Sequence, residues 1–417
     1  MAERNVLDRR TFVKGMLAAG ATVTVAACVP SATPTATPAP TPTPTPVWPT
    51  GWALRQIGMA VKDLDAAVAR YSKYPQAWFA PETLLDSGPW RYTTGERFPA
   101  YLDGKAADVK VRIRMMYWAD IPIPFELFQT IEGKWAGTRF LDEVGGDGIN
   151  HLGFEVDDAL AEANRLIAAG AKEVVRFGDA AIAPPSMVYV DLDPELKGPG
   201  LMIEFFQRNP VRRASAATPT PTSAPTATPP TPTRPTGWVL GQVGMAVKDL
   251  DAAVARYSKY PFTWFSPETL LDTVPWVYGS GAHKGERFPS YIDGKLQDVK
   301  LRIRSMYWGG CPIPFELFQT IEGEWAGTRF LAENGGDGIN HVLIRVDDAL
   351  AEANKLIAVG AKEVVKFGDP AKESPSLVYV DLDPQLKGPG LMLELIKRNA
   401  VGRAATPTPT TTPTPTR

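Results

Sequence analysis

Short segments in which apolar and polar residues alternate predict β-strands, because successive side chains of a strand point to opposite faces. In residues 110–118, Val111, Ile113 and Met115 share one face, and Arg112 and Arg114 share the other. Comparable strand patterns lie at 54–61, 123–131, 149–156, 172–177, 187–191 and 200–207, with a weaker one between about 85 and 102.

Two segments, 63–74 and 158–171, have helical periodicity instead. Asp63 is suited to cap the first helix, because its carboxylate can accept hydrogen bonds from backbone N–H groups of the first turn. A glycine-rich break at 145–148 separates two series of elements that have the same order. The sequence therefore predicts an α+β fold built of paired β-α-β-β-β modules.

The whole pattern occurs twice. The sequence at 58–75 recurs unchanged at 244–261, and the sequence at 124–133 recurs at 314–323, with a short insertion near 279–284. Such a long period indicates duplication of a whole domain. Thr/Pro-rich tracts, which have no apolar face to bury, flank both copies. We predict a first domain at 50–212, a linker at 213–236, a second domain at 237–402 and a Thr/Pro-rich tail at 403–417.

Residues 1–28 have the pattern of an export signal. Arg9 and Arg10 precede a short apolar run, and this pair resembles a twin-arginine signal, although Asp8 replaces the usual Ser or Thr. The run Val25-Ala26-Ala27-Cys28 resembles a bacterial lipobox, whose cysteine is lipidated; the alternative is an incidental cysteine after an ordinary cleavage site. The Thr/Pro-rich linker 29–49 would then hold the domains off the membrane. We therefore expect export by the twin-arginine machinery, a lipid anchor at Cys28 and a location outside the cytoplasm, on the membrane of a bacterial cell envelope.

Composition excludes some classes of protein. The formal net charge is −2 and no long basic stripe occurs, so a nucleic-acid partner is not expected. Two cysteines, Cys28 and Cys311, lie in unrelated contexts and exclude a disulfide framework. Three histidines occur, and two of them, His151 and His341, occupy equivalent positions of the two copies. His283 lies in the insertion and is expected to be a solvated surface residue, and Cys311 a packing residue.

Four polar residues of each copy interrupt apolar strand patterns. A carboxylate within an apolar strand is costly unless it is paired or bound to a metal. In the first copy these residues are Gln56, Glu126, His151 and Glu204. Their counterparts are Gln242, Glu316, His341 and Glu394. Amide, carboxylate and imidazole groups together are suitable ligands for a divalent metal. The alternative is that the glutamates pair with Arg112 or Arg114 and that His151 is a satisfied core histidine.

The order of elements, with Gly-Asp-Gly-Ile-Asn-His opening the second half and Gly-Leu-Met-Ile-Glu closing it, resembles the vicinal oxygen chelate superfamily. Glyoxalase I, methylmalonyl-CoA epimerase, extradiol dioxygenases and bleomycin-resistance proteins belong to this superfamily. The resemblance implies two curled eight-stranded mixed sheets with helices outside. It also implies one divalent metal (Zn, Ni, Co, Mn or Fe(II)) per domain, held by the residues just named. The glutamine departs from the dioxygenases, which typically use two histidines and one glutamate, and resembles the glyoxalase I and epimerase branch.

The resemblance also implies catalytic roles. Glu204 and Glu394 would be the bases, and Glu126 and Glu316 would act on the opposite face of a small-molecule substrate. Aromatic and basic residues could bind that substrate; core packing and a solvated face are the alternatives. These candidates are Arg112, Arg114, Trp118, Arg302, Arg304 and Trp308. Three functions stay open: a metal-dependent isomerase, epimerase or glyoxalase-like lyase; an iron-dependent extradiol-type dioxygenase; and a non-catalytic protein that sequesters a small molecule.

Overall fold

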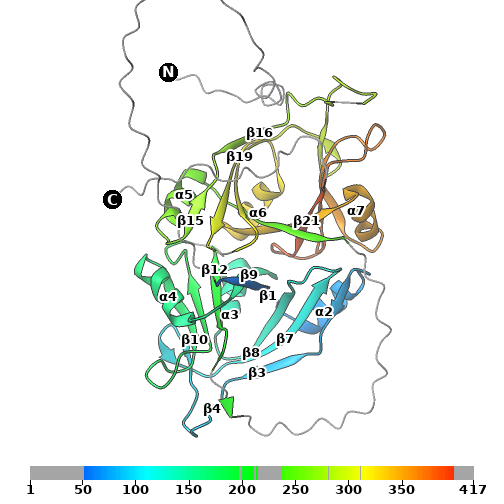
Figure 1. Cartoon of the computed structure of the whole chain (residues 1–417). Coiled ribbons are helices and arrows are strands. Elements are labelled where there is room, and N and C mark those ends of the chain that lie inside the picture. Colours follow the sequence, from blue (N-terminus) through cyan, green and yellow to red (C-terminus); the bar gives the residue numbers. More distant parts are fainter. Residues whose placement is uncertain are drawn as a thin grey trace, which may run out of the picture. The chain divides into compact units, whose positions relative to one another are not determined.

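The computed structural model describes residues 51–196, 200–210, 213–214, 237–279, 281–309 and 311–398 (Figure 1). The predicted export signal with Cys28, the linker 29–49, nearly all of the linker 213–236 and the tail 403–417 lie outside these ranges. Among the described residues, no helix combines the length and the apolarity that crossing a membrane requires. Residues 49–401 form one compact unit that contains both copies of the repeat.

Each copy forms one large mixed sheet with helices on it. The first contains β1 (Ala53–Ala60), α2 (Leu64–Ser72), β2 (Ala77–Phe79), β3 (Thr83–Asp86), β4 (Arg91–Tyr92), β5 (Ala100–Leu102), β6 (Lys105–Ala106), β7 (Lys110–Trp118), β8 (Phe125–Glu132), α3 (Ala136–Val144), β9 (Gly148–Val156), α4 (Ala159–Ala168), β10 (Lys172–Phe177), β11 (Met187–Asp191) and β12 (Met202–Gln207). A two-residue strand, β13 (Arg213–Ala214), pairs with β4.

The second copy repeats this order. It contains β14 (Val239–Ala246), α5 (Leu250–Ser258), β15 (Thr263–Phe265), β16 (Thr269–Asp272), β17 (Ser290–Ile292), β18 (Lys295–Leu296), β19 (Lys300–Trp308), β20 (Phe315–Glu322), α6 (Ala326–Asn334), β21 (Gly338–Val346), α7 (Ala349–Ile357), β22 (Lys362–Phe367), β23 (Leu377–Asp381) and β24 (Met392–Lys397).

The sheet topology confirms the paired β-α-β-β-β modules. The first sheet has the order β2-β7-β8-β1-β9-β12-β11-β10-β5-β6, with β3 also paired to β7. The first and last long strands of each module are parallel neighbours, β1 with β8 and β9 with β12, and the modules join through antiparallel pairing of β1 and β9. Each sheet has 11 strands and not the predicted eight. The additional strands are short, and the weak pattern between about 85 and 102 resolves into pieces of two to four residues.

The helices follow local rules and bury one face. Asp63 caps α2, since its Oδ1 accepts a hydrogen bond from the Ala66 N–H at 3.0 Å. Leu64, Ala67 and Tyr71 recur at helical spacing and are buried. Helix α3 was not predicted. It contains Gly137, whose missing Cβ allows the backbone to lie against the Phe128 ring.

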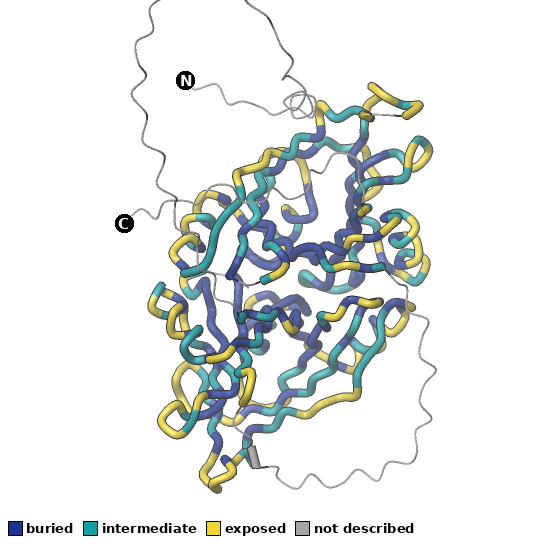
Figure 2. Tube along the Cα trace, viewed as in Figure 1, coloured by how far each residue is buried: buried dark blue, intermediate teal, exposed yellow. Residues whose placement is uncertain are grey.

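The strands are buried along much of their length (Figure 2). Apolar residues form clusters on both faces of each sheet. One cluster lies in the curl of the first sheet and includes Phe128, Trp135 and Tyr189. The largest cluster lies on the other face, under α2 and α4, and continues into the second copy. Its ring contacts include Trp52 with Trp308, with centroids 6.1 Å apart. Both sheet faces are therefore covered, and the polar groups placed within them are cut off from water.

Candidate metal centre

Four adjacent strands, β8-β1-β9-β12, carry the four polar residues predicted for the first copy. Gly58 of β1 is the register partner of Glu126 and of His151. Glu204 is the register partner of Gly153, which also pairs with Gln56. Because paired residues of neighbouring strands share a face, all four side chains enter the curl of the sheet together. The four residues come from both modules of one copy.

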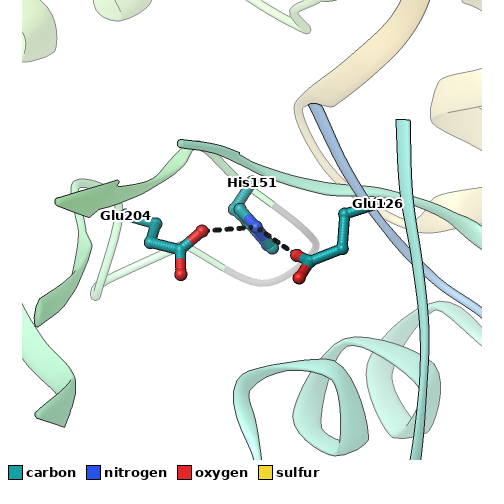
Figure 3. A group of neighbouring side chains, drawn as sticks. All are labelled: Glu126, His151 and Glu204. Atoms are coloured by element: carbon teal, nitrogen blue, oxygen red, sulfur yellow. Dashed lines mark ion pairs between the residues drawn. The ribbon is translucent and has the colours of Figure 1, made fainter. Parts of the chain in front are cut away.

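The side chains of Glu126, His151 and Glu204 converge on a common point (Figure 3). The His151 Nε2 atom lies 3.0 Å from the Oε2 atom of Glu204 and 3.3 Å from that of Glu126. The Gln56 Nε2 atom donates to the same two oxygens, at 2.9 and 2.7 Å. Amide nitrogen and oxygen are exchanged by a simple side-chain flip, so Gln56 can equally present its oxygen to this point.

The group is almost completely buried. Solvent reaches 7% of Glu126, 5% of Gln56 and essentially none of His151 and Glu204. Burial alone lowers the pKa of His151, but the negative charges of Glu204 and Glu126 outweigh it and raise the pKa to about 9. Burial raises the pKa of Glu204, although the charge of His151 acts in the opposite direction. Without a bound cation, the two carboxylates therefore favour the protonated form of His151.

The histidine is oriented for a ligand on Nε2. The Asn150 Oδ1 atom lies 3.0 Å from Nδ1, so Nδ1 carries the proton of the neutral ring and Nε2 presents its lone pair. Among the described residues, neither Nε2 nor the Glu204 Oε1 atom has a hydrogen bond of standard geometry. A buried imidazole nitrogen aimed at two carboxylates, within a set of N and O donors, fits a divalent cation.

Glycine and aromatic residues shape the space around the histidine. A Cβ atom at Gly58 would lie 1.9 Å from Cε1 of the His151 ring, so only glycine leaves room for it. The rings of Phe128 and Tyr189 lie on other sides, with centroids 5.4 and 5.0 Å from the imidazole. Burial raises the pKa of Tyr189 well above its ordinary value, so its hydroxyl stays a neutral hydrogen-bonding group beside Glu204.

The second copy brings its four predicted residues together in the same way. The His341 Nε2 atom lies 3.1 Å from Glu394 and 3.6 Å from Glu316, and Gln242 donates to Glu394 at 3.4 Å. Asn340 holds Nδ1 at 3.0 Å. A Cβ atom at Gly244 would lie 2.0 Å from the imidazole Cε1. Opposing carboxylates raise the pKa of His341 to about 9 although burial acts to lower it.

The predicted substrate-binding residues require a correction. Glu126 is the register partner of Met115, whereas Arg114 pairs with Leu127, on the opposite face of the sheet. Arg112 binds Asp65 and Glu82 there. Trp118 is completely buried and packs on Tyr74 and Trp238. The register is the same in the second copy, so Arg302, Arg304 and Trp308 lie on the face of the sheet opposite Glu316. These six residues therefore do not face the polar cluster, and the alternatives of a paired surface and core packing hold instead.

The same geometry excludes pairing of the glutamates with Arg112 or Arg114, because these arginines lie on the opposite face of the sheet. His283 is partly exposed and lies 3.1 Å from Glu286, as a surface residue would. Cys311 packs against the large core cluster. Sequence reasoning missed Asn150 and Asn340. Their position directly before each histidine was the available signal.

The fold and the site define a protein of tandem β-α-β-β-β modules with a buried glutamate–histidine–glutamate cluster in each domain. Residues 55–184 match the model of the family described as Glyoxalase/Bleomycin resistance/Dioxygenase superfamily. This match lies within the first domain, and the second domain repeats the sequence and topology of the first, so both domains are similar to this family.

No curated protein matches the sequence. Solved structures with similarity include a mutant of 4-hydroxymandelate synthase from Streptomyces coelicolor, with 13% identity, 85% of this chain and 94% of that chain covered, and a TM-score of 0.48. Methylmalonyl-CoA epimerase from Mycobacterium tuberculosis has 20% identity, with 38% of this chain and 89% of that chain covered and a TM-score of 0.26.

Proposed function

We propose that the protein is a divalent-metal-dependent enzyme that moves protons on a small oxygenated acid or carbonyl compound, as an isomerase, epimerase or glyoxalase-like lyase. The observation that carries this proposal is the convergence of two carboxylates, an imidazole nitrogen and an amide within one buried cluster in each domain. Gln56, Glu126, His151 and Glu204 would hold one cation, and Gln242, Glu316, His341 and Glu394 a second.

The chemistry follows from the donor set. A divalent cation there would act as a Lewis acid toward substrate oxygens. Glu204 and Glu126 flank His151 (Figure 3). One carboxylate can take a proton from the carbon next to a carbonyl, and the C–H electron pair is then delocalised onto the carbonyl oxygen. Return of a proton by the other carboxylate, to the other face or to the neighbouring carbon, completes an epimerisation or isomerisation.

Proton exchange with solvent tests this function without knowledge of the natural substrate. We expect the protein, loaded with Zn, Ni, Co or Mn, to exchange the protons next to the carbonyl of hydroxyacetone or pyruvate in D2O, measured by proton NMR. The double variant Glu204→Gln, Glu394→Gln keeps oxygen ligands but lacks the bases, so its exchange rate should fall at least about 100-fold.

Two other outcomes would replace the proposal. Oxygen uptake and ring opening of catechol by the Fe(II)-loaded protein would indicate a dioxygenase of the extradiol type. Binding of these probes without exchange or oxygen uptake would indicate a protein that sequesters small molecules. Both outcomes leave the metal site in place and change only the reaction assigned to it.

We also propose that the protein is exported and anchored to a membrane of the bacterial cell envelope through Cys28. The paired arginines and the run ending at Cys28 support this proposal. When the full chain is produced in a bacterium, we expect it in the membrane fraction, and the Cys28→Ser variant in the soluble extracytoplasmic fraction. A wild-type chain that stays soluble with an unmodified Cys28, as judged by mass spectrometry, would contradict the anchor.

A further inference from the structure

In the second domain, residues 382–391 form the loop that leads into β24, the strand that carries Glu394. This loop is held by α2 of the first domain. The Tyr71 hydroxyl of α2 donates to the Asp383 Oδ2 atom at 2.5 Å. The Tyr74 hydroxyl donates to the Leu382 carbonyl at 2.8 Å, and Arg70 pairs with Asp383 at 2.7 Å. These contacts join the first domain to the segment that directly precedes Glu394.

The contact is reciprocal. In the first domain the corresponding segment precedes Glu204, and its Asp193 accepts a hydrogen bond from the Tyr257 hydroxyl of α5 at 2.6 Å. Tyr260 donates to the Leu192 carbonyl at 2.5 Å, and Arg256 pairs with Asp193 at 2.6 Å. Each domain therefore supplies the same three side chains to the other domain's loop. We call these two sets of contacts the reciprocal clamps.

Within each clamp the aspartate also fixes its own loop. The Asp383 Oδ2 atom accepts a hydrogen bond from the Leu391 N–H at 2.7 Å, and Leu382 and Leu391 pair through their backbones at 3.0 Å. The Asp383 side chain is 1% exposed and Tyr71 is completely buried. A buried carboxylate of this kind is costly when it loses a partner, so the loop has little freedom to move away.

The clamps lie beside strands that carry ligands. The Gly390 N–H donates to the Asp147 carbonyl at 2.9 Å, and Gly148, the first residue of β9, bridges to Gly390. A Cβ atom at Gly146 would lie 1.8 Å from the Lys387 carbonyl oxygen, which explains the glycine-rich break at this point. From this bridge His151 and Glu394 are three and four residues along their strands, or roughly 10–13 Å.

We infer that Tyr71 and Tyr257 are positioning residues that act across the domain boundary. Tyr71 of the first domain holds the strand of Glu394 in the second site, and Tyr257 of the second domain holds the strand of Glu204 in the first. Each site therefore depends on the other domain for the position of its second glutamate. This inference rests on the proposed metal sites.

The test uses full-length chains in which one site is disabled. His151→Ala leaves the second site, and His341→Ala leaves the first. Into each background we introduce Tyr71→Phe or Tyr257→Phe, which removes only a hydroxyl. Co(II) affinity and the Co(II) absorption spectrum of the remaining site are measured, with thermal unfolding followed in parallel.

We expect a crossed pattern. In the His151→Ala chain, Tyr71→Phe should weaken Co(II) binding on the order of 10-fold and change the spectrum, whereas Tyr257→Phe should leave both nearly unchanged. In the His341→Ala chain, Tyr257→Phe should weaken Co(II) binding and change the spectrum, whereas Tyr71→Phe should leave both nearly unchanged. A merely structural role would weaken both sites to the same extent.

Several results would overturn the inference. Tyr71 also lies 3.6 Å from the Met59 sulfur in its own domain, so an effect that follows the tyrosine's own domain would contradict action across the boundary. Equal effects on both sites, or none, would do the same. If a variant fails to fold, Tyr74→Phe and Tyr260→Phe provide the same comparison. Absence of Co(II) binding in the wild type would instead contradict the proposed function itself.

Discussion

Replacing both His151 and His341 by alanine is expected to reduce the metal content of the purified protein from about two ions per chain to nearly none. Each histidine supplies the nitrogen ligand of its cluster, and loss of one ligand of four weakens such a site severely. Metal content is measured by elemental mass spectrometry after dialysis against metal-free buffer.

The third histidine provides a matched control. His283 lies on the surface beside Glu286, so His283→Ala should retain about two ions per chain. Each single substitution, His151→Ala or His341→Ala, should retain about one. A double variant that keeps the wild-type content, or a wild type that takes up no ion when Zn, Ni, Co, Mn and Fe(II) are offered in turn, would contradict the assignment of these clusters as metal sites.

The local pattern of the sequence was sufficient to predict most of the long strands and the four polar residues that converge in each copy. The strands at Lys110–Trp118, Lys172–Phe177 and Met187–Asp191 have the predicted bounds. The two-residue periodicity also placed Arg112 and Arg114 on the face opposite Val111, Ile113 and Met115, as the register confirms. Polar residues inside apolar strands were informative because their burial needs a common partner.

Which face of a strand lines the site could not be predicted from periodicity. Both faces of β7 are covered by apolar clusters, with Val111 in one and Met116 in the other. Arg112, Arg114 and Trp118 were therefore assigned to the substrate although they lie on the face away from Glu126. Only the register between β7 and β8 decides this point, and register depends on pairing between strands distant in sequence.

The contacts between domains were beyond sequence reasoning for a related reason. The glycines at 145–148 were interpreted as a break between modules, which is a local property. Their further role, close approach to residues 387–390 of the other domain, depends on tertiary packing. Helix α3 was also missed. Its Gly137 weakens the local helical signal, and the packing of this glycine against Phe128 is a tertiary contact that the local pattern does not show.

Gly58→Ala is expected to abolish the first metal site and to leave the second, so that about one ion per chain remains. The added methyl group would lie 1.9 Å from the His151 ring, and β1 is held on both sides by β8 and β9. The imidazole therefore has to leave the point where Glu126 and Glu204 meet. Overpacking of this kind also costs about 1–3 kcal/mol of unfolding free energy.

The chain offers an equivalent glycine in the second copy and a control glycine for this substitution. Gly244→Ala meets His341 at 2.0 Å and should remove the second site selectively, whereas Gly279 has no atom within 4 Å of an added Cβ, so Gly279→Ala should leave metal content and stability unchanged. Elemental analysis and thermal unfolding compare the three variants. Retention of both ions by Gly58→Ala and Gly244→Ala would mean that the histidines bind no metal in the positions they occupy here, because neither ring can stay in place beside the added methyl group.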